Sequence, residues 1–138
     1  MGEVVPTERV AERLKLRKTA KVVCRDRRYL IDDIPVELAT TYVPLSIARG
    51  TRITSPDTGP GGVYARIEEA GHQLASFTEE VGARMPTPFE RRRLSLPEGT
   101  PVITVMRVAY DVEGRPVELT DTVKSAPSYV LEYSFPAT

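Results

Sequence analysis

Hydrophobic and polar residues alternate along six segments of the chain, which is the pattern of half-buried β-strands. The segments are 21–31, 35–43, 73–86, 100–112, 115–124 and 128–135. Turn-forming residues separate the first segment from the second at 32–34, and Glu113 and Gly114 separate the fourth from the fifth. Each of these two pairs is therefore predicted to form a β-hairpin.

Three shorter segments carry apolar residues at helical spacing and predict helices over 7–15, 63–72 and 87–96. The last helix has the clearest start signal, because its threonine, proline and glutamate stand at the positions of a capping box. Residues 44–62 are rich in proline and glycine and are predicted to form a long loop. Taken together, the pattern predicts an α+β fold, with a mostly antiparallel six-stranded sheet and short flanking helices.

A repeat relates the two predicted hairpins. The tetrapeptide PVEL occurs at 35–38 and again at 116–119. Sliding the chain along itself aligns further identical residues upstream of each copy, provided that one residue is inserted before the tyrosines. The pairs are Arg13 with Arg93, Leu14 with Leu94, Leu16 with Leu96, Val22 with Val102, Arg27 with Arg107 and Tyr29 with Tyr110. We therefore predict that 21–43 and 101–124 are duplicated hairpins, related by a pseudo-two-fold axis in one sheet.

The composition limits the possible functions. Nineteen basic residues balance nineteen acidic ones, so this chain alone lacks the basic excess that is typical of nucleic-acid-binding domains. Cys24 is the only cysteine and His72 the only histidine, so neither an internal disulfide nor a metal site is expected, and no cofactor is expected either. The chain has no apolar run of membrane length. Its 138 residues suit one domain, and its cysteine usage fits a reducing compartment such as the cytoplasm.

Charged residues fall at matched places in the two hairpins. Arg25 and Arg27 lie on one face of their strand because side chains alternate, and Glu37 lies on the neighbouring strand. Arg107 and Glu118 repeat Arg27 and Glu37 in the second copy. Arginine side chains suit phosphate and carboxylate groups. The hairpins and the TGPGG segment are therefore predicted to enclose a site for a small polar or anionic molecule.

A purely structural interpretation of the same residues stays open. Arg27 with Glu37, and Arg107 with Glu118, would then be cross-strand ion pairs on the wet face of a half-buried sheet. Each pair would contribute at most about 1 kcal/mol to the free energy of unfolding.

Several stretches together resemble a known family. They are the Arg-x-Arg of residues 25–27, the segment DTGPGGVYARIEEAGH and, above all, LPEGTPVITVMRVAYDVEGRPVEL. From about Pro6 to Phe135 the chain resembles the UTRA domain, the effector-binding domain of HutC-type GntR transcription regulators. The resemblance implies a sheet core related in fold to chorismate lyase, a homodimer, and a pocket for a small metabolite.

The resemblance also implies which residues contact the ligand. In members that sense sugar phosphates, the arginines of the Arg-x-Arg hold the phosphate and acidic residues of both hairpins hold hydroxyls. Gly62 stands where the family often has serine, and only the final tyrosine of the family's last motif, Tyr129, is kept. These departures weigh against a sugar phosphate as the effector. The candidate ligand-binding residues are Arg25, Arg27, Glu37, Gly62, Tyr64, Arg107, Glu118, Lys124 and Tyr129.

Three functions are compatible with these residues. The resemblance favours a ligand-sensing regulatory domain that spans 1–138 as a single domain and reaches DNA only through a separate winged-helix domain. That DNA-binding domain is expected to be absent from this chain. The alternatives are an enzyme like chorismate lyase and a dimerisation module with a vestigial pocket. The regulatory interpretation implies a small-molecule effector and a cytoplasmic homodimer that has no contact with a membrane.

Overall fold

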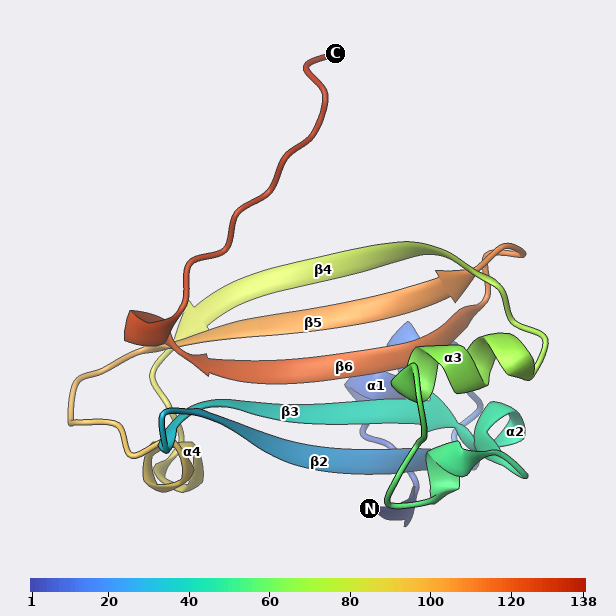
Figure 1. The fold of residues 1–138 in the computed structure, drawn as a ribbon, viewed down its shortest axis with the longest axis horizontal. Helices are drawn as coiled ribbons and strands as arrows, with labels where there is room; N and C mark the ends of the chain where they lie inside the picture. The colour runs from blue at the N-terminus through green and yellow to red at the C-terminus, as the bar shows by residue number, and fades with distance from the viewer.

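The chain folds around one six-stranded antiparallel sheet with the strand order β1-β2-β3-β6-β5-β4 (Figure 1). A computed structural model describes all residues, 1–138. The predicted α+β class is confirmed. None of the helices is long and apolar enough to cross a membrane. The elements are β1 (Gly2–Val4), α1 (Glu8–Arg13), β2 (Val22–Ile31), β3 (Ile34–Pro44), α2 (Leu45–Ala48), the 3₁₀ helix η1 (Arg52–Thr54), α3 (Gly62–Glu69), β4 (Leu74–Arg84), α4 (Pro88–Arg93), β5 (Val102–Asp111), β6 (Pro116–Ser125) and the 3₁₀ helix η2 (Ala126–Ser128).

The two predicted hairpins form the centre of the sheet and are related by a pseudo-two-fold axis. β2 pairs with β3, β5 pairs with β6, and β3 lies beside β6, so the strand order is symmetric about the β3–β6 boundary. Thr40 and Asp121 occupy equivalent positions in the two copies and face each other across this boundary. The axis therefore passes between these two residues, and the prediction of two hairpins in one sheet is confirmed.

The second copy is one residue longer than the first. This extra residue lies in the turn between β5 and β6 rather than within a strand. Both hairpins shift register just after the residue opposite the PVEL glutamate, which is Tyr29 in β2 and Ala109 in β5. Tyr29 is therefore equivalent to Ala109, and the expected match of Tyr29 with Tyr110 is wrong. The shorter turn, between β2 and β3, consists of Asp32 and Asp33 with φ of 50° and 66°, the left-handed backbone that a two-residue hairpin turn favours.

The repeat extends to the helices α1 and α4, which precede the two hairpins. Each helix follows a threonine N-cap, Thr7 or Thr87, and is followed by a residue with positive φ, Lys15 or Ser95. The capping box of Thr87 and Glu90 forms as predicted. Even β1 has a counterpart, because it pairs with β2 in the register in which the end of β4 pairs with β5.

Hydrophobic clusters fix the helices on both faces of the sheet. On one face, α1 packs Val10 and Leu14 against Met106, Val108 and Leu119 of β5 and β6, and a smaller cluster lies beneath α4. On the other face, α2, η1 and α3 cover the right-hand end of the sheet in Figure 1 and close a second buried cluster. The left-hand part of that face carries no helix, and this asymmetry positions the candidate site.

Two predicted segments differ from the structure. Residues 128–135 form no strand, because η2 ends at Ser128 and the chain then leaves the sheet as an extended tail (Figure 1). Its alternating pattern favours an extended backbone, but a strand also requires a neighbouring strand to accept and donate its hydrogen bonds. The sixth strand of the sheet is β1, which is too short for a pattern to reveal. The predicted loop over 44–62 contains α2 and η1, which are likewise too short to show helical periodicity.

Candidate functional site

The candidate residues gather on the face of the sheet that α3 partly covers. All except Tyr129 line two adjoining cavities of about 260 Å³ and 280 Å³, which together we call the central cleft. The first, the α3 cavity, is lined by Arg25, Arg27, Thr41, Thr58, Gly61, Gly62, Val63, Tyr64, Glu118 and Thr120. The second, the tail cavity, is lined by Glu37, Tyr64, Glu79, Val105, Arg107, Thr120, Thr122, Lys124 and Leu131. The two cavities meet at Tyr64 and Thr120.

The pseudo-two-fold axis relates the two cavities to each other. Arg27, Thr41 and Glu118 line the α3 cavity, and their equivalents in the other copy, which are Arg107, Thr122 and Glu37, line the tail cavity. Each cavity therefore takes its arginine from one hairpin and its glutamate from the other. The prediction that both hairpins enclose a shared cleft rested on this duplication, and the geometry brings the residues together.

Strand register explains why these side chains meet. Paired residues on neighbouring strands point to the same face of a sheet. One row of paired residues crosses the sheet through the cleft, in the order Arg25, Thr41, Thr120, Arg107 and Glu79. The cleft floor is therefore polar from one edge region of the sheet to the other.

Arg25 stabilises the wall of the cleft. Its guanidinium donates hydrogen bonds to the carbonyl oxygens of Ile53 at 2.9 Å, Ser55 at 2.5 Å and Pro56 at 2.8 Å. These bonds fasten η1 and the residues that follow it to β2, although nearly thirty residues separate them in the sequence. Arg25 therefore has fewer free N–H groups for a ligand than Arg27, which donates only to the hydroxyl of Thr41.

The alternative of simple cross-strand ion pairs is wrong. Arg27 lies opposite Ala39 on β3, and Arg107 lies opposite Thr120 on β6 and Glu79 on β4, so neither arginine faces the PVEL glutamate of its own hairpin. The ion pairs of the structure include neither arginine. Both positive charges therefore remain available at the cleft.

Arg107 is the arginine with the most open hydrogen-bonding capacity in the cleft. Its guanidinium lies 3.8 Å from the centroid of the Phe77 ring, and the Phe77 ring lies 5.6 Å from that of Tyr64. The Nε of Arg107 is buried and has no hydrogen-bond partner. A buried donor without an acceptor costs about 1–3 kcal/mol. This unpaired donor makes Arg107 a candidate contact for a ligand oxygen.

Glu118 is a buried acid of the α3 cavity, next to the residues where the two cavities meet. Only 2% of its surface is exposed, and its carboxylate accepts a hydrogen bond from the Thr120 hydroxyl at 2.8 Å. Burial raises the pKa of Glu118, while its hydrogen bonds with Thr120 and Tyr64 and the charges of Arg107 and Arg27 oppose the rise. Burial, with the nearby Glu118 charge, also raises the pKa of Tyr64. Glu118 and Tyr64 therefore form one hydrogen-bonded pair in the α3 cavity.

The far end of the tail cavity contains a second charged group of residues. Lys124 forms an ion pair with Glu37 across the β3–β6 boundary, and its ammonium nitrogen lies 4.3 Å from the centroid of the Tyr129 ring. Lys124 and Glu37 are both mostly buried, so their charges are weakly screened by water. This arrangement places Tyr129 beside the cleft rather than in its lining.

Backbone conformation and close packing explain why glycine is found at the start of α3. Gly61 has φ of 82°, and a Cβ there would lie 2.7 Å from the side chain of the next turn of α3. Arg66 holds the same segment, because it donates to the carbonyl oxygens of Thr58 at 2.9 Å and Pro60 at 3.0 Å. The start of α3, including Gly62, is thereby fixed against the α3 cavity.

The cleft also contains residues that the sequence did not single out as ligand-binding. Thr41, Thr120 and Thr122 follow the strand alternation of the candidate residues, but threonine is common in strands and gave no separate signal. Glu79 comes from β4, outside the duplicated hairpins. Leu131 comes from the tail, whose position no local pattern predicts.

Comparison with known proteins decides the family. A model described as the UTRA domain matches residues 1–129. The chain belongs to the UTRA domain family. The match includes every strand of the sheet and every candidate residue, and it confirms the resemblance that the sequence indicates.

This UTRA domain is similar to parts of longer transcription regulators. It is 30% identical over 138 residues to an HTH-type transcriptional regulator of Streptomyces coelicolor, covering 98% of this chain and 51% of that protein. It is 31% identical over 114 residues to an HTH-type transcriptional regulator of Mycobacterium tuberculosis, covering 81% of this chain and 41% of that protein. The chain thus spans about half the length of the curated relatives it matches, or less.

Solved structures share the fold of this UTRA domain. The crystal structure of a GntR-family transcriptional regulator superposes with a TM-score of 0.89 at 29% identity, covering 99% of this chain and 57% of that one. The C-terminal domain of the histidine utilization repressor from Pseudomonas syringae superposes with a TM-score of 0.83 at 20% identity, covering 98% and 93% of the two chains. At that lower identity the likeness concerns the fold alone.

Proposed function

We propose that this UTRA domain binds a small anionic metabolite in the central cleft and that, in a longer regulator, binding alters the affinity of a separate winged-helix domain for DNA. The observation that carries the proposal is Arg107, whose buried Nε has no acceptor and whose guanidinium is held in place on Phe77. A carboxylate or phosphate oxygen of the ligand supplies that acceptor. The relatives are transcription regulators, which supports a sensor rather than an enzyme.

The cleft suits an anion that also carries hydroxyl groups. Arg27 and Arg107 supply positive charge from the two hairpins, and the hydroxyls of Thr41 and Thr120 lie 3.2 Å apart between them. Glu118, as a buried acceptor, binds a ligand hydroxyl. Arg25 contributes mainly by fixing the wall of the cleft.

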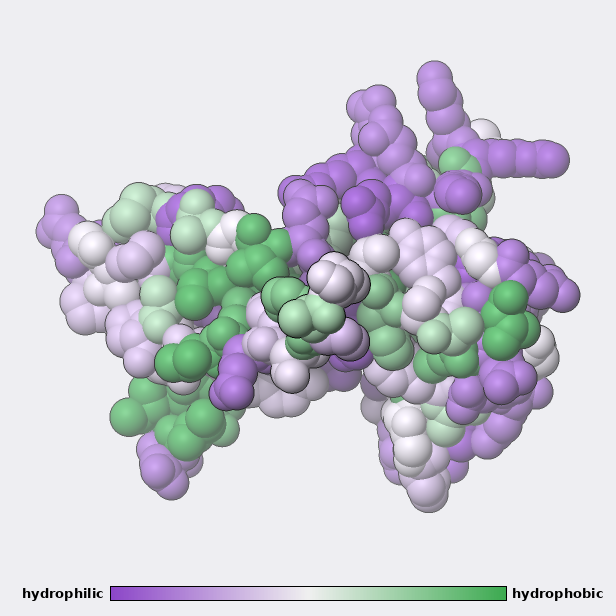
Figure 2. Space-filling model, turned by 90° about the horizontal axis from the view of Figure 1, so that it is seen from above, coloured by the Kyte–Doolittle hydropathy of each residue, from purple (hydrophilic) through white to green (hydrophobic).

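The second part of the proposal is that the domain forms a cytoplasmic homodimer. Val130 and Phe135 of the tail are 91% and 81% exposed, and Phe77 and Val81 of β4 are also exposed. Figure 2 shows hydrophobic residues gathered on the left half of the molecule, the side from which the tail departs in Figure 1. The outer edge of β4 has no partner strand. A second copy covers this apolar surface and the free edge.

The proposed function is tested by thermal unfolding of the protein with a library of carboxylated and phosphorylated metabolites. An effector at a hundred times its dissociation constant adds roughly 2.7 kcal/mol to the free energy of unfolding. We expect Arg107→Ala to abolish this shift and Arg92→Ala, which removes an exposed arginine of α4, to keep it. An effector that stabilises both variants equally places its binding site outside the central cleft. Formation of 4-hydroxybenzoate from chorismate would instead support the enzymatic alternative.

A further inference from the structure

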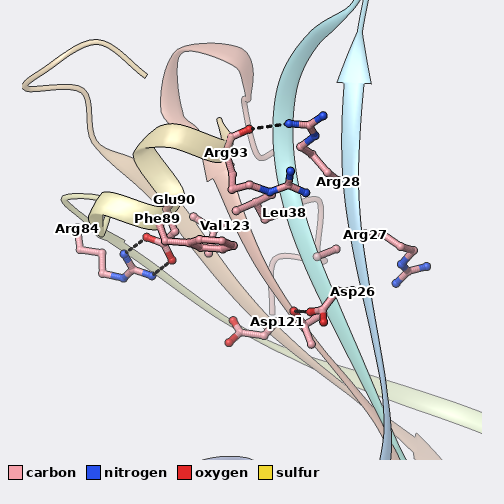
Figure 3. A pocket seen from close by; sticks show the side chains of 12 residues that line it. Asp26, Arg27, Arg28, Leu38, Arg84, Phe89, Glu90, Arg93, Asp121 and Val123 are labelled. Carbon is pink, nitrogen blue, oxygen red and sulfur yellow. Dashed lines mark hydrogen bonds and ion pairs between the residues drawn. The ribbon is translucent and has the colours of Figure 1, made fainter. Parts of the chain in front are cut away.

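A second cleft lies on the opposite face of the sheet, between α4 and the strands β2, β3 and β6 (Figure 3). Its volume is about 500 Å³, which suits a small molecule. Asp26 and Arg28 line it, and they alternate along β2 with the residues that line the central cleft. The same strands therefore separate two polar clefts, which we distinguish as the central cleft and the α4 cleft.

The α4 cleft exists because the two copies of the repeat have diverged. In the other copy, α1 packs directly on the sheet and buries Met106 and Val108 of β5. Strand register shows that Asp26 is equivalent to Met106 and Arg28 to Val108, because the residues opposite them in the two hairpins also correspond. Where one copy has an apolar contact between helix and sheet, the other has a cleft lined with charges.

The charges of the α4 cleft stand apart by sign instead of neutralising one another. Figure 3 shows the carboxylates of Asp26 and Asp121 at one end and the guanidinium groups of Arg28 and Arg93 at the other. Asp26 accepts a hydrogen bond from the Thr40 hydroxyl at 2.7 Å. At the basic end, Arg28 donates a hydrogen bond to the backbone carbonyl of Arg93 at 3.4 Å. No ion pair joins the two ends.

The remaining acid near the cleft is already neutralised. Glu90 of α4 binds both guanidinium nitrogens of Arg84, at 2.7 Å and 2.9 Å. Asp121 has no such partner, and burial raises the pKa of its carboxyl group while Arg9 and Arg84 oppose the rise. A bound cation would supply the missing counter-charge for Asp121.

An apolar surface connects the acidic end to the basic end. Phe89 of α4 and Leu38 of β3 lie between the two ends in Figure 3. Asp26 and Arg28 are two residues apart on β2, so their backbones are separated by roughly 7 Å. A ligand that reaches both ends therefore carries its two charges several bonds apart, with an apolar spacer between them.

We infer that the α4 cleft is a binding site for an ω-amino acid. Its ammonium group binds Asp26 and Asp121, its carboxylate binds Arg28 and Arg93, and its methylene chain lies against Phe89 and Leu38. An α-amino acid, whose two charges are adjacent, engages only one end. The α4 cleft shares only Arg27 with the lining of the central cleft, and its existence does not depend on the proposed effector.

The test is isothermal titration of the whole chain with 4-aminobutyrate, 5-aminovalerate and 6-aminohexanoate. Butyrate and butylamine, which each lack one of the charges, and glycine serve as matched ligands. We expect saturable binding of at least one ω-amino acid and at least tenfold weaker binding of the three control ligands. Absence of binding by all three ω-amino acids overturns the inference, as does equal binding of butyrate or butylamine.

Variants locate the site. Asp121→Asn and Arg93→Gln are each expected to weaken binding at least tenfold, whereas Arg92→Gln, at an exposed neighbouring arginine, is expected to leave it unchanged. Loss of binding in Arg107→Ala, with binding kept in Asp121→Asn, would place the ligand in the central cleft and overturn the inference.

A second kind of variant imitates the other copy. Asp26→Met with Arg28→Val restores the residues found beneath α1, and we expect it to abolish binding while the melting temperature of the free protein is kept or raised. Unimpaired binding of the ω-amino acid by this variant also overturns the inference.

Discussion

The carboxylate of Glu118 accepts a hydrogen bond at 2.8 Å from the hydroxyl of Thr120, two residues further along β6, at the point where the two cavities of the central cleft meet. Because burial raises the pKa of Glu118, the folded chain binds this proton more tightly than the unfolded chain does. Its contribution to stability is therefore fully present below the unfolded pKa, which is near 4.5, and is lost as pH rises through the folded pKa.

Replacing Glu118 with glutamine is expected to stabilise the free protein at neutral pH, because it removes a buried charge and keeps the shape of the side chain. The gain is about 1.4 kcal/mol for each unit by which the pKa of Glu118 is raised. Urea unfolding at pH 7 measures it. The difference between the variant and the wild type should shrink as pH falls toward 4, where Glu118 is protonated in both states, and the same variant should lose its response to the effector.

Arg25→Ala is expected to lower the free energy of unfolding by about 2 kcal/mol, because three backbone carbonyl oxygens lose their donor. Arg27→Ala removes one bond from an exposed side chain and should change stability by less than about 0.5 kcal/mol. Denaturant unfolding of both variants measures the contrast. We expect Arg27→Ala to lose the effector's thermal shift. A variant at Arg27 that binds the identified effector with unchanged affinity would contradict its role in the cleft.

The turn between β5 and β6 should make stability depend on pH in the acid range. Asp111 accepts hydrogen bonds from the backbone N–H of Arg115 at 2.9 Å and of Glu113 at 3.0 Å, and its other oxygen lies 3.1 Å from Nδ1 of His72. The Arg115 bond above all lowers the pKa of Asp111, with help from His72 and Glu113. Its contribution is therefore present above the unfolded pKa and is lost as pH falls through the folded pKa. Melting temperatures from about pH 6 down to about pH 2 should fall less steeply for Asp111→Asn.

Deleting residues 130–138 is expected to convert the proposed homodimer into a monomer, because the tail carries the most exposed apolar residues next to the free β4 edge. Sedimentation at tens of micromolar protein measures the change. Val130→Ser with Phe135→Ser is the milder comparison, since neither side chain lines the central cleft. A truncated chain that sediments as a dimer would assign the interface to another surface.

The central hairpins could be predicted from the sequence because two signals coincide there. Alternation gives the strands, and the second PVEL copy shows that they form a repeated unit. The tail shows the same alternation at Leu131, Tyr133 and Phe135, yet forms no strand. Local pattern reports the preferred backbone, whereas pairing depends on which other segment lies alongside. For the same reason no local pattern reveals β1, since only its pairing with β2 defines it.

The sequence predicts on which face of the sheet the candidate residues lie, but it does not predict what each residue binds. Strand alternation places Arg25, Arg27, Glu37 and Glu118 on one side of the sheet, as found. It does not reveal that a distant loop uses the donors of Arg25, or that Glu37 binds Lys124 instead of an arginine. These roles depend on contacts between segments far apart in the sequence, which no local period encodes.

A perfectly duplicated chain would offer an effector two equivalent poses, one reversed with respect to the other about the axis between Thr40 and Asp121. Divergence has removed this degeneracy. One cavity is lined by α3 and the other by the tail, and Arg27 donates to a hydroxyl whereas the buried Nε of Arg107 has no acceptor. If the proposed effector is unsymmetrical, we therefore expect it to bind in a single orientation, with one end toward the first hairpin and the other end toward the second.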